Sequence, residues 1–394
     1  MTSPAIRIGL DARLSGKQHA GIGRYIENIL ARLPLLAPQI KWVYFFASKN
    51  QLAELMATFA ALPEAKNVSV TDFFSRLEIH YLPVKHYSLA EQRQLPGIFE
   101  AAELDLLHVP HFNIPLFYRG SLVVTIHDLL WHEKKGLQTT TLPAWQYYLK
   151  YSFYKLVVGR AIKRALEIFV PTQTVKKSVL RHYPRTQTNK IKITPEGFYL
   201  AQPEPLSSAL KAKLPPVGKA NLLYVGSLYP HKNLEVVLQA LQQLPADTNF
   251  HLLIIGSRDV FSQKVKARVQ ELKIGHLVTF LGYVPDAQLV TLYQQSLALI
   301  QPSLSEGFGL TGLEAMAAKT LVLASDIPIF HEVYGEAAIY FDPHNAADFL
   351  QKLTDLEPAT RRAQLQKGLT QTTKYDWQKT ATLTLNGYQK ILKF

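Results

Sequence analysis

The feature that most constrains this chain is a regular alternation of short apolar runs with longer amphipathic segments. In the first half, runs rich in β-branched and aromatic residues occur at 6–10, 42–46, 106–109, 123–127, 168–171 and 191–194. In the second half, similar runs occur at 222–225, 252–255, 278–281, 297–302, 322–324 and 339–341. Helical patterns separate several of them, and this alternation predicts βα units and a parallel sheet in each half. The expected fold class is α/β.

The length and one proline-rich segment predict two domains. The 394 residues exceed one compact core of ordinary size. The alternation breaks at 195–216, where five prolines interrupt any long regular element. We therefore expect an N-terminal domain over 1–200 and a C-terminal domain over 201–375, both Rossmann-like and doubly wound. Such sheets bind ligands at the carboxyl ends of their strands, so we expect the active site in a cleft between the domains.

The last segment, 376–394, carries a helical stripe of Trp377, Ala381, Leu385, Tyr388 and Leu392. The stripe predicts a helix that packs on a core. One option is that this helix crosses back and packs on the first domain.

Composition excludes several classes of site and location. The chain has no cysteine, which excludes disulfides, thiolate nucleophiles and zinc–thiolate sites. No apolar run reaches the 18 or so residues that cross a bilayer, and the first residues enter a strand-like segment without a signal-peptide core. We expect a globular cytoplasmic protein.

The positive charge is concentrated in the first half. Residues 1–200 hold 25 Lys and Arg against 14 Asp and Glu, out of a net charge of +13 for the chain. A basic and aromatic stretch at 143–166 resembles an interfacial helix that rests on anionic lipid at the inner face of the membrane. The alternative is a partly buried amphipathic helix with solvated Lys and Arg. No nucleic-acid recognition motif accompanies the charge, and we expect no such partner.

The most informative stretch is 299–318, which predicts a buried strand, a turn and a helix. Gly307 and Gly309 allow a ligand to approach the backbone, and a helix N-terminus near Thr311 can bind a diphosphate. Glu306 and Glu314 lie eight positions apart. The alternatives are a capping box of Thr311 with Glu314, and a solvated loop carboxylate at Glu306.

The segment SEGFGLTGLEAMA resembles the E-x7-E signature of family 4 of the retaining glycosyltransferases, which have the GT-B fold. The resemblance implies that Glu306 contacts the donor sugar and that Glu314 binds the ribose hydroxyls. It also implies that the backbone amides around Phe308, Gly309 and Leu310 line the sugar and phosphates.

A second element, LLYVGSLYPHKN, places Lys232 after a strand and before a helix. A lysine there can neutralise a leaving diphosphate. The segment is similar to the family's G-R-L-x-x-x-K-G pattern, with Ser227 where many members have Arg and with His231 as a basic residue before the lysine. The resemblance implies that Ser227, His231 and Lys232 bind the donor. The alternative for Lys232 is an exposed loop lysine.

The first domain offers a glycine-containing loop. Gly21 and Gly23 stand between the first strand and a helix. This loop lacks the third glycine of a dinucleotide-binding fingerprint, so an oxidoreductase is disfavoured. The resemblance implies instead that the loop with Gly21 and Gly23 lies over the donor phosphates. We assign Arg24, which lies nearby, to the acceptor.

Histidines follow two of the predicted strands. His127 and Asp128 end the run at 123–127, and His127 resembles the family's active-site histidine. The alternatives are a satisfied core histidine and a strand-terminal cap by Asp128. His108 and His111 follow another strand, and we assign His111 and Asp128, with His108 more loosely, to the acceptor.

We expect neither a cofactor nor a metal ion. His108, His111, His127 and His132 do not have the spacing of a zinc site. The sequence also holds no D-x-D pair for a divalent ion on the diphosphate.

The resemblance implies a retaining, metal-independent glycosyltransferase that uses front-face displacement, with His127, Lys232 and Glu306 as catalytic residues. GIGRY, IHD and VGSLYPHKN look like branches that transfer mannose from GDP-mannose to a glycan or lipid-linked acceptor in polysaccharide or lipopolysaccharide biosynthesis. The alternatives are a UDP-hexose donor, an epimerase or phosphorylase of the same fold, and a non-catalytic nucleotide-sugar-binding protein.

Overall fold

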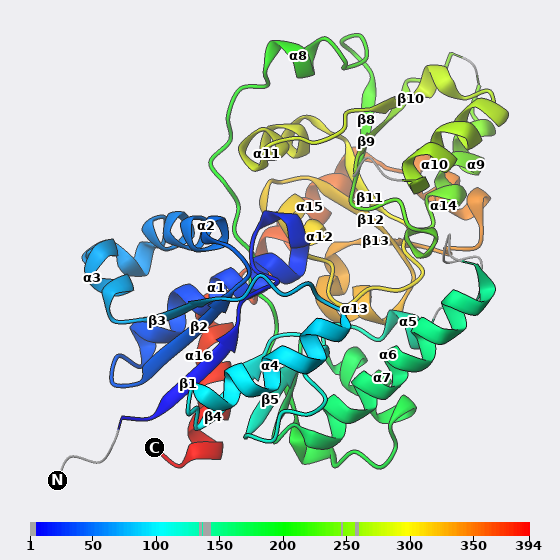
Figure 1. Ribbon diagram of the computed structural model, residues 1–394. Helices are drawn as coiled ribbons and strands as arrows, with labels where there is room; N and C mark the ends of the chain where they lie inside the picture. Colours follow the sequence, from blue (N-terminus) through cyan, green and yellow to red (C-terminus); the bar gives the residue numbers. More distant parts are fainter. Residues whose placement is uncertain (1–4, 134–135, 137–142, 246, 257–259) are drawn as a thin grey trace. The chain divides into compact units, whose positions relative to one another are not determined.

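The computed structural model describes residues 5–133, 136, 143–245, 247–256 and 260–394. The chain forms two compact units. Unit 1 takes the described residues of Met1–Leu129, Leu142–Gly197 and Asp376–Phe394. Unit 2 takes those of Leu130–Thr141 and Phe198–Tyr375. Each unit holds one parallel sheet with helices, which confirms the α/β class (Figure 1).

The sheet of unit 1 has seven strands in the order β3-β2-β1-β4-β5-β6-β7. Its strands are β1 (Arg7–Asp11), β2 (Lys41–Phe46), β3 (Glu78–Tyr81), β4 (Leu106–Val109), β5 (Leu122–Thr125), β6 (Ile168–Val170) and β7 (Ile191–Ile193). Its α-helices are α1 (Ala20–Leu36), α2 (Lys49–Ala60), α3 (Val70–Ser75), α4 (Leu89–Ala101), α6 (Ala144–Arg164), α7 (Gln173–His182) and α16 (Trp377–Leu392). Short 3-10 turns are η1 (Lys17–His19), η2 (Pro63–Ala65) and η4 (Thr188–Lys190).

Helices cover both faces of this sheet, so its strands are apolar on both sides. In β2, Trp42, Tyr44 and Phe46 face one buried cluster, and Val43 and Phe45 face another. This alternation follows from the two-residue period of a strand. Burial on both faces is why the strands read as continuous apolar runs in the sequence.

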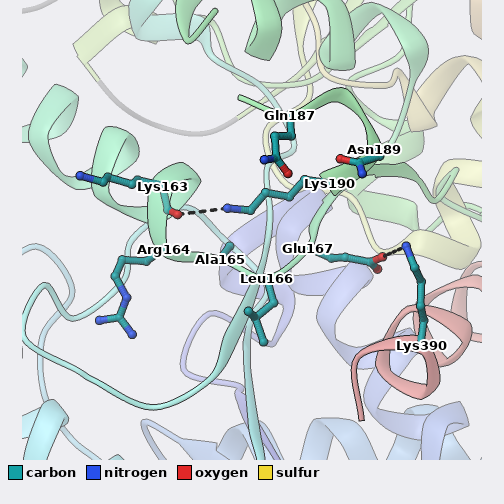
Figure 2. Close-up of a pocket in the computed structure, with 9 residues that line it drawn as sticks. All are labelled: Lys163, Arg164, Ala165, Leu166, Glu167, Gln187, Asn189, Lys190 and Lys390. Carbon is teal, nitrogen blue, oxygen red and sulfur yellow. Dashed lines mark hydrogen bonds and ion pairs between the residues drawn. The ribbon is translucent and has the colours of Figure 1, made fainter. Parts of the chain in front are cut away.

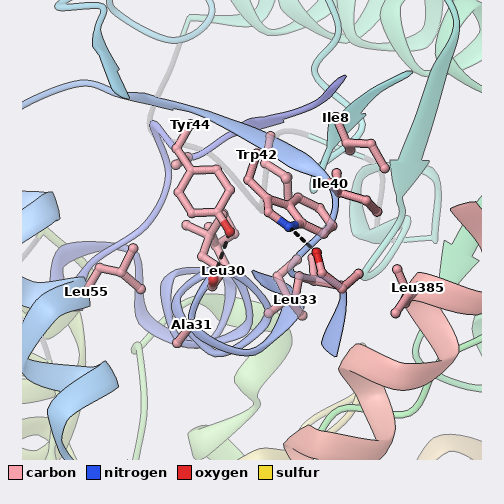
Figure 3. Close-up of a cluster of buried hydrophobic side chains, with 14 of the residues drawn as sticks. Ile8, Leu30, Ala31, Leu33, Ile40, Trp42, Tyr44, Leu55 and Leu385 are labelled. Atoms are coloured by element: carbon pink, nitrogen blue, oxygen red, sulfur yellow. Dashed lines mark hydrogen bonds between the residues drawn. The ribbon is translucent and has the colours of Figure 1, made fainter. Parts of the chain in front are cut away.

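The helix α16 completes the first of these clusters. Trp377, Leu385 and Tyr388 are buried in it, and α16 packs against α1. Figure 3 shows Leu385 in the cluster with Trp42. The close packing has a local cause at Gly387, where a Cβ atom would lie 2.7 Å from the ring of Phe169.

The strand β3 was not predicted from the sequence. It pairs only with β2, at the edge of the sheet, and its sequence EIHY is half-polar. Glu78 accepts hydrogen bonds from Arg7 at 3.1 Å and forms an ion pair with Lys41 at 3.0 Å. An edge strand that is held by charged neighbours lacks the apolar run by which the other strands were found.

The sheet of unit 2 has six strands in the order β10-β9-β8-β11-β12-β13. Its strands are β8 (Ala220–Val225), β9 (Phe250–Ile255), β10 (Val278–Phe280), β11 (Ala298–Gln301), β12 (Leu321–Ser325) and β13 (Ile339–Phe341). Its α-helices are α5 (Leu130–Glu133), α8 (Ser208–Lys211), α9 (Leu234–Gln242), α10 (Val260–Glu271), α11 (Asp286–Gln295), α12 (Leu310–Ala317), α13 (Pro328–Tyr334), α14 (Ala346–Thr354) and α15 (Pro358–Thr372). Short 3-10 turns are η5 (Pro230–Lys232), η6 (Gly275–Leu277) and η7 (Gly335–Ala337).

The proline-rich segment at 195–216 is part of unit 2 from Phe198 onward. Leu206 and Leu210 from this segment are buried in one of the two cores of unit 2. The prolines stop long regular elements, as expected, but the segment still supplies core residues.

Replacing Tyr388 with Phe should destabilise unit 1. The buried Tyr388 hydroxyl lies 2.5 Å from Nδ1 of the buried His108, so the substitution leaves this nitrogen without its partner. We expect a loss of about 2 kcal/mol in unfolding free energy. Urea unfolding followed by tryptophan fluorescence measures it, because Trp42, Trp145 and Trp377 lie in unit 1. Tyr283→Phe, at an exposed site of unit 2, is the control. An unchanged urea midpoint for Tyr388→Phe would show that the hydrogen bond between Tyr388 and His108 does not stabilise unit 1.

Candidate functional site

The strand orders locate the functional edge of each sheet. In unit 1 the order reverses between β1 and β4, and in unit 2 it reverses between β8 and β11. At such a switch point the loops after two neighbouring strands diverge and leave room for a ligand at the carboxyl ends. In unit 2 the two loops carry Lys232 and Glu306, which are 74 positions apart in the sequence.

Lys232 and Glu306 form an ion pair at this edge. Lys232 Nζ lies 2.5 Å from Glu306 Oε1, and Ser303 Oγ donates to the same oxygen at 2.8 Å. The Glu306 side chain is only 15% exposed. Both alternatives from the sequence, an exposed loop lysine and a solvated loop carboxylate, are therefore wrong.

The carboxylate of Glu306 stays ionised despite its burial. Burial raises the pKa of Glu306, but the charge and hydrogen bond of Lys232 outweigh this effect and hold the pKa below its ordinary value. The site therefore presents a fixed negative charge beside a fixed positive charge.

The amide of Asn233 fixes the loop that carries Lys232. Asn233 has a left-handed backbone, with φ of 54°, and begins α9 as its N-cap. Its Nδ2 donates to the carbonyls of Pro302 at 3.0 Å and Pro343 at 2.8 Å. One side chain thus joins the loops after β8, β11 and β13. Asparagine is one of the few residues other than glycine that adopt this backbone readily.

The N-terminus of α12 is shaped by Gly309. This residue has a φ of 101° and is the N-cap of the helix. A Cβ atom on Gly309 or Gly312 would collide with the ring of Tyr334. The Tyr334 hydroxyl lies 2.6 Å from the Gly309 carbonyl and 2.5 Å from Gln301 Oε1.

The helix therefore begins at Leu310, one residue before the expected position. The capping box of Thr311 with Glu314 is wrong, because Thr311 lies inside the helix and accepts a hydrogen bond from Gln301 Nε2 at 2.6 Å.

Four other predicted donor residues lie around this turn. Phe308 is buried in the core against Tyr375, so only its backbone is available to a ligand. Glu314 is buried on α12 and accepts a hydrogen bond from the Tyr293 hydroxyl at 3.3 Å. Gly307 and Leu310 are partly exposed.

The loop after β8 brings Ser227 and His231 to the same edge. Gly226 has a φ of 153°, and Ser227 follows it with its carbonyl 2.5 Å from the Tyr224 hydroxyl. The His231 carbonyl accepts from the Leu304 backbone at 2.8 Å, which ties this loop to the one that carries Glu306.

A slot of about 140 Å³ opens nearby at the carboxyl ends of β8, β9 and β10. Apolar side chains, two glycines and two lysines line it: Leu228, Ile254, Phe280, Leu281, Gly256, Gly282, Lys213 and Lys266, with Ser262. Lys213 Nζ lies 3.4 Å from the Leu281 carbonyl, and Lys266 lies over the ring of Phe280. A slot lined by both apolar side chains and lysines suits a heterocyclic base.

In unit 1, His127 lies just beyond β5, which ends two residues earlier at Thr125. His127 Nδ1 lies 2.8 Å from Glu196 Oε1, and Nε2 lies 3.2 Å from the Pro110 carbonyl. Burial lowers the pKa of His127, but the hydrogen bond and charge of Glu196 outweigh it, so the pKa is raised above its ordinary value. Both ring nitrogens face acceptors, so the surroundings of His127 favour the protonated ring.

His108 and His111 differ in their surroundings. His108 is fully buried between Tyr388 and Thr125, so its assignment to the acceptor is wrong for this structure. His111 lies at the loop after β4, and its Nδ1 accepts from the Asn113 backbone at 3.3 Å. Burial lowers the pKa of His111 to about 3, so its ring is neutral.

Asp128 is partly exposed at the loop after β5. It follows β5, which pairs with β4, so Asp128 and His111 follow neighbouring strands at the same edge of the sheet. Its charge adds to the larger effect of burial in raising the pKa of Tyr154.

The glycines of the first domain lie inside α1 rather than in the loop before it. Gly23 is buried, and a Cβ atom there would collide with the Gly16 carbonyl. Gly21 is exposed in the first turn, and Arg24 is partly exposed on the same helix. Close packing of the preceding loop therefore accounts for Gly23.

Unit 1 also contains a cavity of about 320 Å³ (Figure 2). Its lining includes Glu167 and Lys190, which immediately precede β6 and β7. It therefore opens at the amino-terminal edge of the sheet, opposite the loops described above. Lys190 donates to the carbonyls of Ile162 and Lys163 at the end of α6, as expected for a structural cation.

Among the described residues, no three His, Asp or Glu side chains gather as ligands of a metal ion would. None of the described helices is both long enough and apolar enough to span a bilayer.

The His127–Glu196 pair predicts a distinctive pH dependence. The raised pKa of His127 means that the pair stabilises the fold fully below pH 6.5 and that this contribution is lost as the pH rises through the folded value. Imidazole NMR titration should place the pKa of His127 above its ordinary value. In Glu196→Gln it should fall, and stability at pH 6 should drop by about 2 kcal/mol.

The control is His344→Gln at an exposed position, which should leave the titration of His127 unchanged. A His127 that titrates at its ordinary value in the native protein would contradict a pKa raised by Glu196.

Two residues at the sites were missed by sequence reasoning. Glu196 follows β7 at the start of the proline-rich segment 195–216, and it is buried against His127. Asn233 follows Lys232 directly. Its signal was the residue type itself, since asparagine adopts a left-handed backbone more readily than most residues.

Comparisons with known proteins show what the chain is similar to. Residues 208–369 match the family described as glycosyl transferases group 1. The chain is 27% identical to the O-antigen chain mannosyltransferase B of Escherichia coli, over 94% of this chain and 96% of that protein. It is 25% identical to the O-antigen chain mannosyltransferase RfbU of Salmonella typhimurium, over 87% and 88% respectively. Among solved structures, sucrose-phosphate synthase from Thermosynechococcus elongatus superposes with a TM-score of 0.72 at 18% identity, over 98% of this chain and 99% of that one.

Proposed function

We propose that this chain, a glycosyltransferase of the GT-B fold that resembles bacterial mannosyltransferases, transfers mannose from GDP-mannose to a glycan or lipid-linked acceptor in O-antigen or related polysaccharide biosynthesis. The proposal includes retention at the anomeric carbon and no metal ion. The observation that carries it is the Lys232–Glu306 pair at the switch point of unit 2.

The diphosphate of the donor would bind at this pair. Lys232 supplies the positive charge that a metal ion supplies elsewhere, and the N-terminus of α12 supplies backbone N–H groups behind Gly309. Glu306 would accept hydrogen bonds from the hydroxyls of the sugar. Glu314 would reach the ribose, and the slot near Phe280 would take the base.

The reaction would proceed on one face of the sugar. The acceptor oxygen bonds to the anomeric carbon as the bond from that carbon to the diphosphate oxygen breaks. The acceptor proton passes to the departing oxygen, and the leaving GDP carries the electron pair. Charge builds up on the diphosphate in the transition state, so Lys232 would contribute most at this stage.

The mannosyl donor is supported by the names of the two relatives and by the lysines of the slot. Lys213 and Lys266 can donate to the carbonyl and ring-nitrogen acceptors of guanine. A UDP-hexose is the alternative donor, and direct comparison of the two nucleotides separates them.

Substitutions at the pair should separate donor binding from transfer. Lys232→Ala should weaken GDP binding at least tenfold, because it removes a charge-assisted contact to the diphosphate. Glu306→Gln should change GDP binding by less than about threefold and lower kcat by about a hundredfold, because its contacts are to the sugar. Thermal shift with GDP and UDP, and transfer assays with GDP-mannose, measure both effects.

Lys352→Ala, at an exposed position of α14, is the matched control and should behave as the native protein. EDTA should change neither binding nor turnover. Transfer that stops with EDTA would overturn the metal-independent part, and full transfer by Glu306→Gln would overturn the assigned site. A native protein that binds no nucleotide would overturn the whole proposal.

We also propose that α6 rests on an anionic membrane surface. Trp145, Tyr148, Leu149, Phe153 and Leu156 are all exposed. Their spacing of three or four places them on one side of the helix.

The opposite side of α6 is buried in unit 1 through residues that include Tyr147, Val158 and Ile162. Lys163 and Arg160 are exposed at the end of the apolar stripe. Exposed apolar side chains on a basic helix match an interfacial anchor, in which each Lys or Arg near anionic lipid contributes about 1 kcal/mol.

Flotation with lipid vesicles tests the α6 surface. The native protein should float with phosphatidylglycerol vesicles and much less with phosphatidylcholine vesicles. A Trp145→Ser, Leu149→Ser double variant should lose most of the bound fraction, because it removes the two most exposed side chains of the stripe. Leu166→Ser, outside the stripe, is the control. A native protein that stays at the bottom of the gradient would sink the proposal.

A further inference from the structure

An exposed aromatic side chain lies at the functional edge of unit 1. Tyr87 is 59% exposed, in the segment between β3 and α4. Its backbone is left-handed, with a φ of 58°. A bulky residue adopts this conformation only where its surroundings impose it, at a cost of about 1 kcal/mol. The molecule thus spends stability to hold an aromatic ring in solvent.

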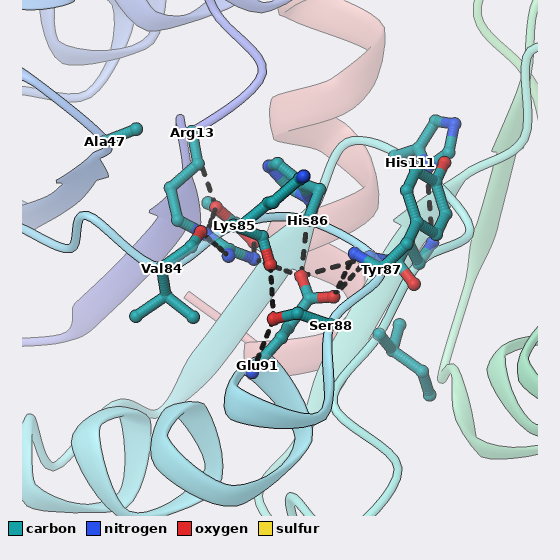
Figure 4. Close-up of polar contacts among 12 residues, drawn as sticks. Arg13, Ala47, Val84, Lys85, His86, Tyr87, Ser88, Glu91 and His111 are labelled. Carbon is teal, nitrogen blue, oxygen red and sulfur yellow. Dashed lines mark hydrogen bonds and ion pairs between the residues drawn. The ribbon is translucent and has the colours of Figure 1, made fainter.

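The carboxylate of Glu91 imposes this conformation. Glu91 is fully buried, and its Oε2 accepts a hydrogen bond from the Tyr87 backbone N–H at 2.8 Å. Figure 4 shows the Glu91 carboxylate between Arg13 and the backbone of Tyr87, with both contacts drawn as dashed lines.

Glu91 is in turn fixed by groups from two other loops. Arg13, just after β1, donates to Glu91 Oε1 at 2.9 Å, and its guanidinium also pairs with Asp11 at 2.7 Å. Asn113, after β4, donates to both oxygens of Glu91 at 2.9 and 3.0 Å. The loops after β1, β3 and β4 are therefore locked together around one buried carboxylate, on both sides of the switch point.

Two polar groups accompany the Tyr87 ring. The His111 ring lies edge-on to it, with centroids 6.3 Å apart. Because His111 Nδ1 accepts a backbone N–H, the proton of the neutral ring is on Nε2. Among the described residues, Nε2 has no hydrogen-bond partner. Asp128 follows β5, which pairs with the strand β4 that precedes His111, so its carboxylate lies at the same edge of the sheet.

We propose that Tyr87, His111 and Asp128 form a subsite for one pyranose ring of the acceptor glycan. The inference rests on the proposed function, since it identifies what unit 1 binds. The C–H face of a pyranose packs on the ring of Tyr87. One sugar hydroxyl accepts from His111 Nε2, and another donates to Asp128. Arg13, Glu91 and Asn113 are positioning residues, because they act through the backbone of Tyr87.

This chemistry selects a sugar over the other classes of ligand. A pyranose has an apolar face and a rim of hydroxyls, which match an aromatic ring beside one donor and one acceptor. A lipid chain would gain nothing from His111 and Asp128, and an anion would be repelled by Asp128.

Binding of simple glycosides tests the subsite without turnover. Saturation-transfer NMR with the methyl glycosides of mannose, glucose and N-acetylglucosamine should show binding of at least one of them to the native protein. Tyr87→Ala should weaken it about tenfold, as expected for the loss of an aromatic contact. Tyr87→Phe keeps the ring and should stay within about twofold. Tyr81→Ala, which removes an exposed aromatic ring from β3, is the matched control.

GDP thermal shifts of the same variants separate this inference from the proposed function. Tyr87→Ala should keep the native GDP shift and melting temperature, because Tyr87 is in unit 1 and Lys232 is in unit 2. Absence of any glycoside signal, or equal binding by Tyr87→Ala and the native protein, would overturn the subsite. A native protein that shows no thermal shift with GDP would overturn the donor assignment. The glycoside binding would then decide on the subsite alone.

Discussion

All the strand pairs of both sheets are parallel, and the rest of the structure depends on this constraint. Parallel strands need a crossover after each strand, and the crossover helices cover the faces of the sheet. The loops at the carboxyl edges are left to bind ligands. Lys232 and Glu306, far apart in the chain, therefore meet because both follow central strands of one sheet.

Buried charges at these edges are compensated locally. Lys232 pairs with Glu306, His127 with Glu196, and Arg13 with Glu91. Charges taken out of water are costly unless a partner is in place, so each pair fixes the position of its loop. Such pre-arranged dipoles and charges need little reorganisation when charge develops on a substrate, which is the property that transferase chemistry requires.

The sequence was sufficient for features with a strong local signal. Continuous apolar runs predicted twelve of the strands, and the α/β class and the GT-B resemblance are confirmed. The edge strand β3 was missed because charged side chains hold it in place of apolar ones. Glu196 was missed because its partner His127 is 69 positions away, and no local pattern records such a pairing. Gly23 was interpreted as a ligand loop, whereas a packing contact with Gly16 accounts for it.

Because α16 belongs to unit 1, this unit cannot complete its fold until the end of the chain has been synthesised. Unit 1 contains residues from the start of the chain, but Trp377, Leu385 and Tyr388 belong to its core. During translation, all of unit 2 emerges before these residues do. The first unit made is therefore the last to close its core. Until then an apolar groove beside α1 stays uncovered on the nascent chain, and such a surface is what chaperones bind.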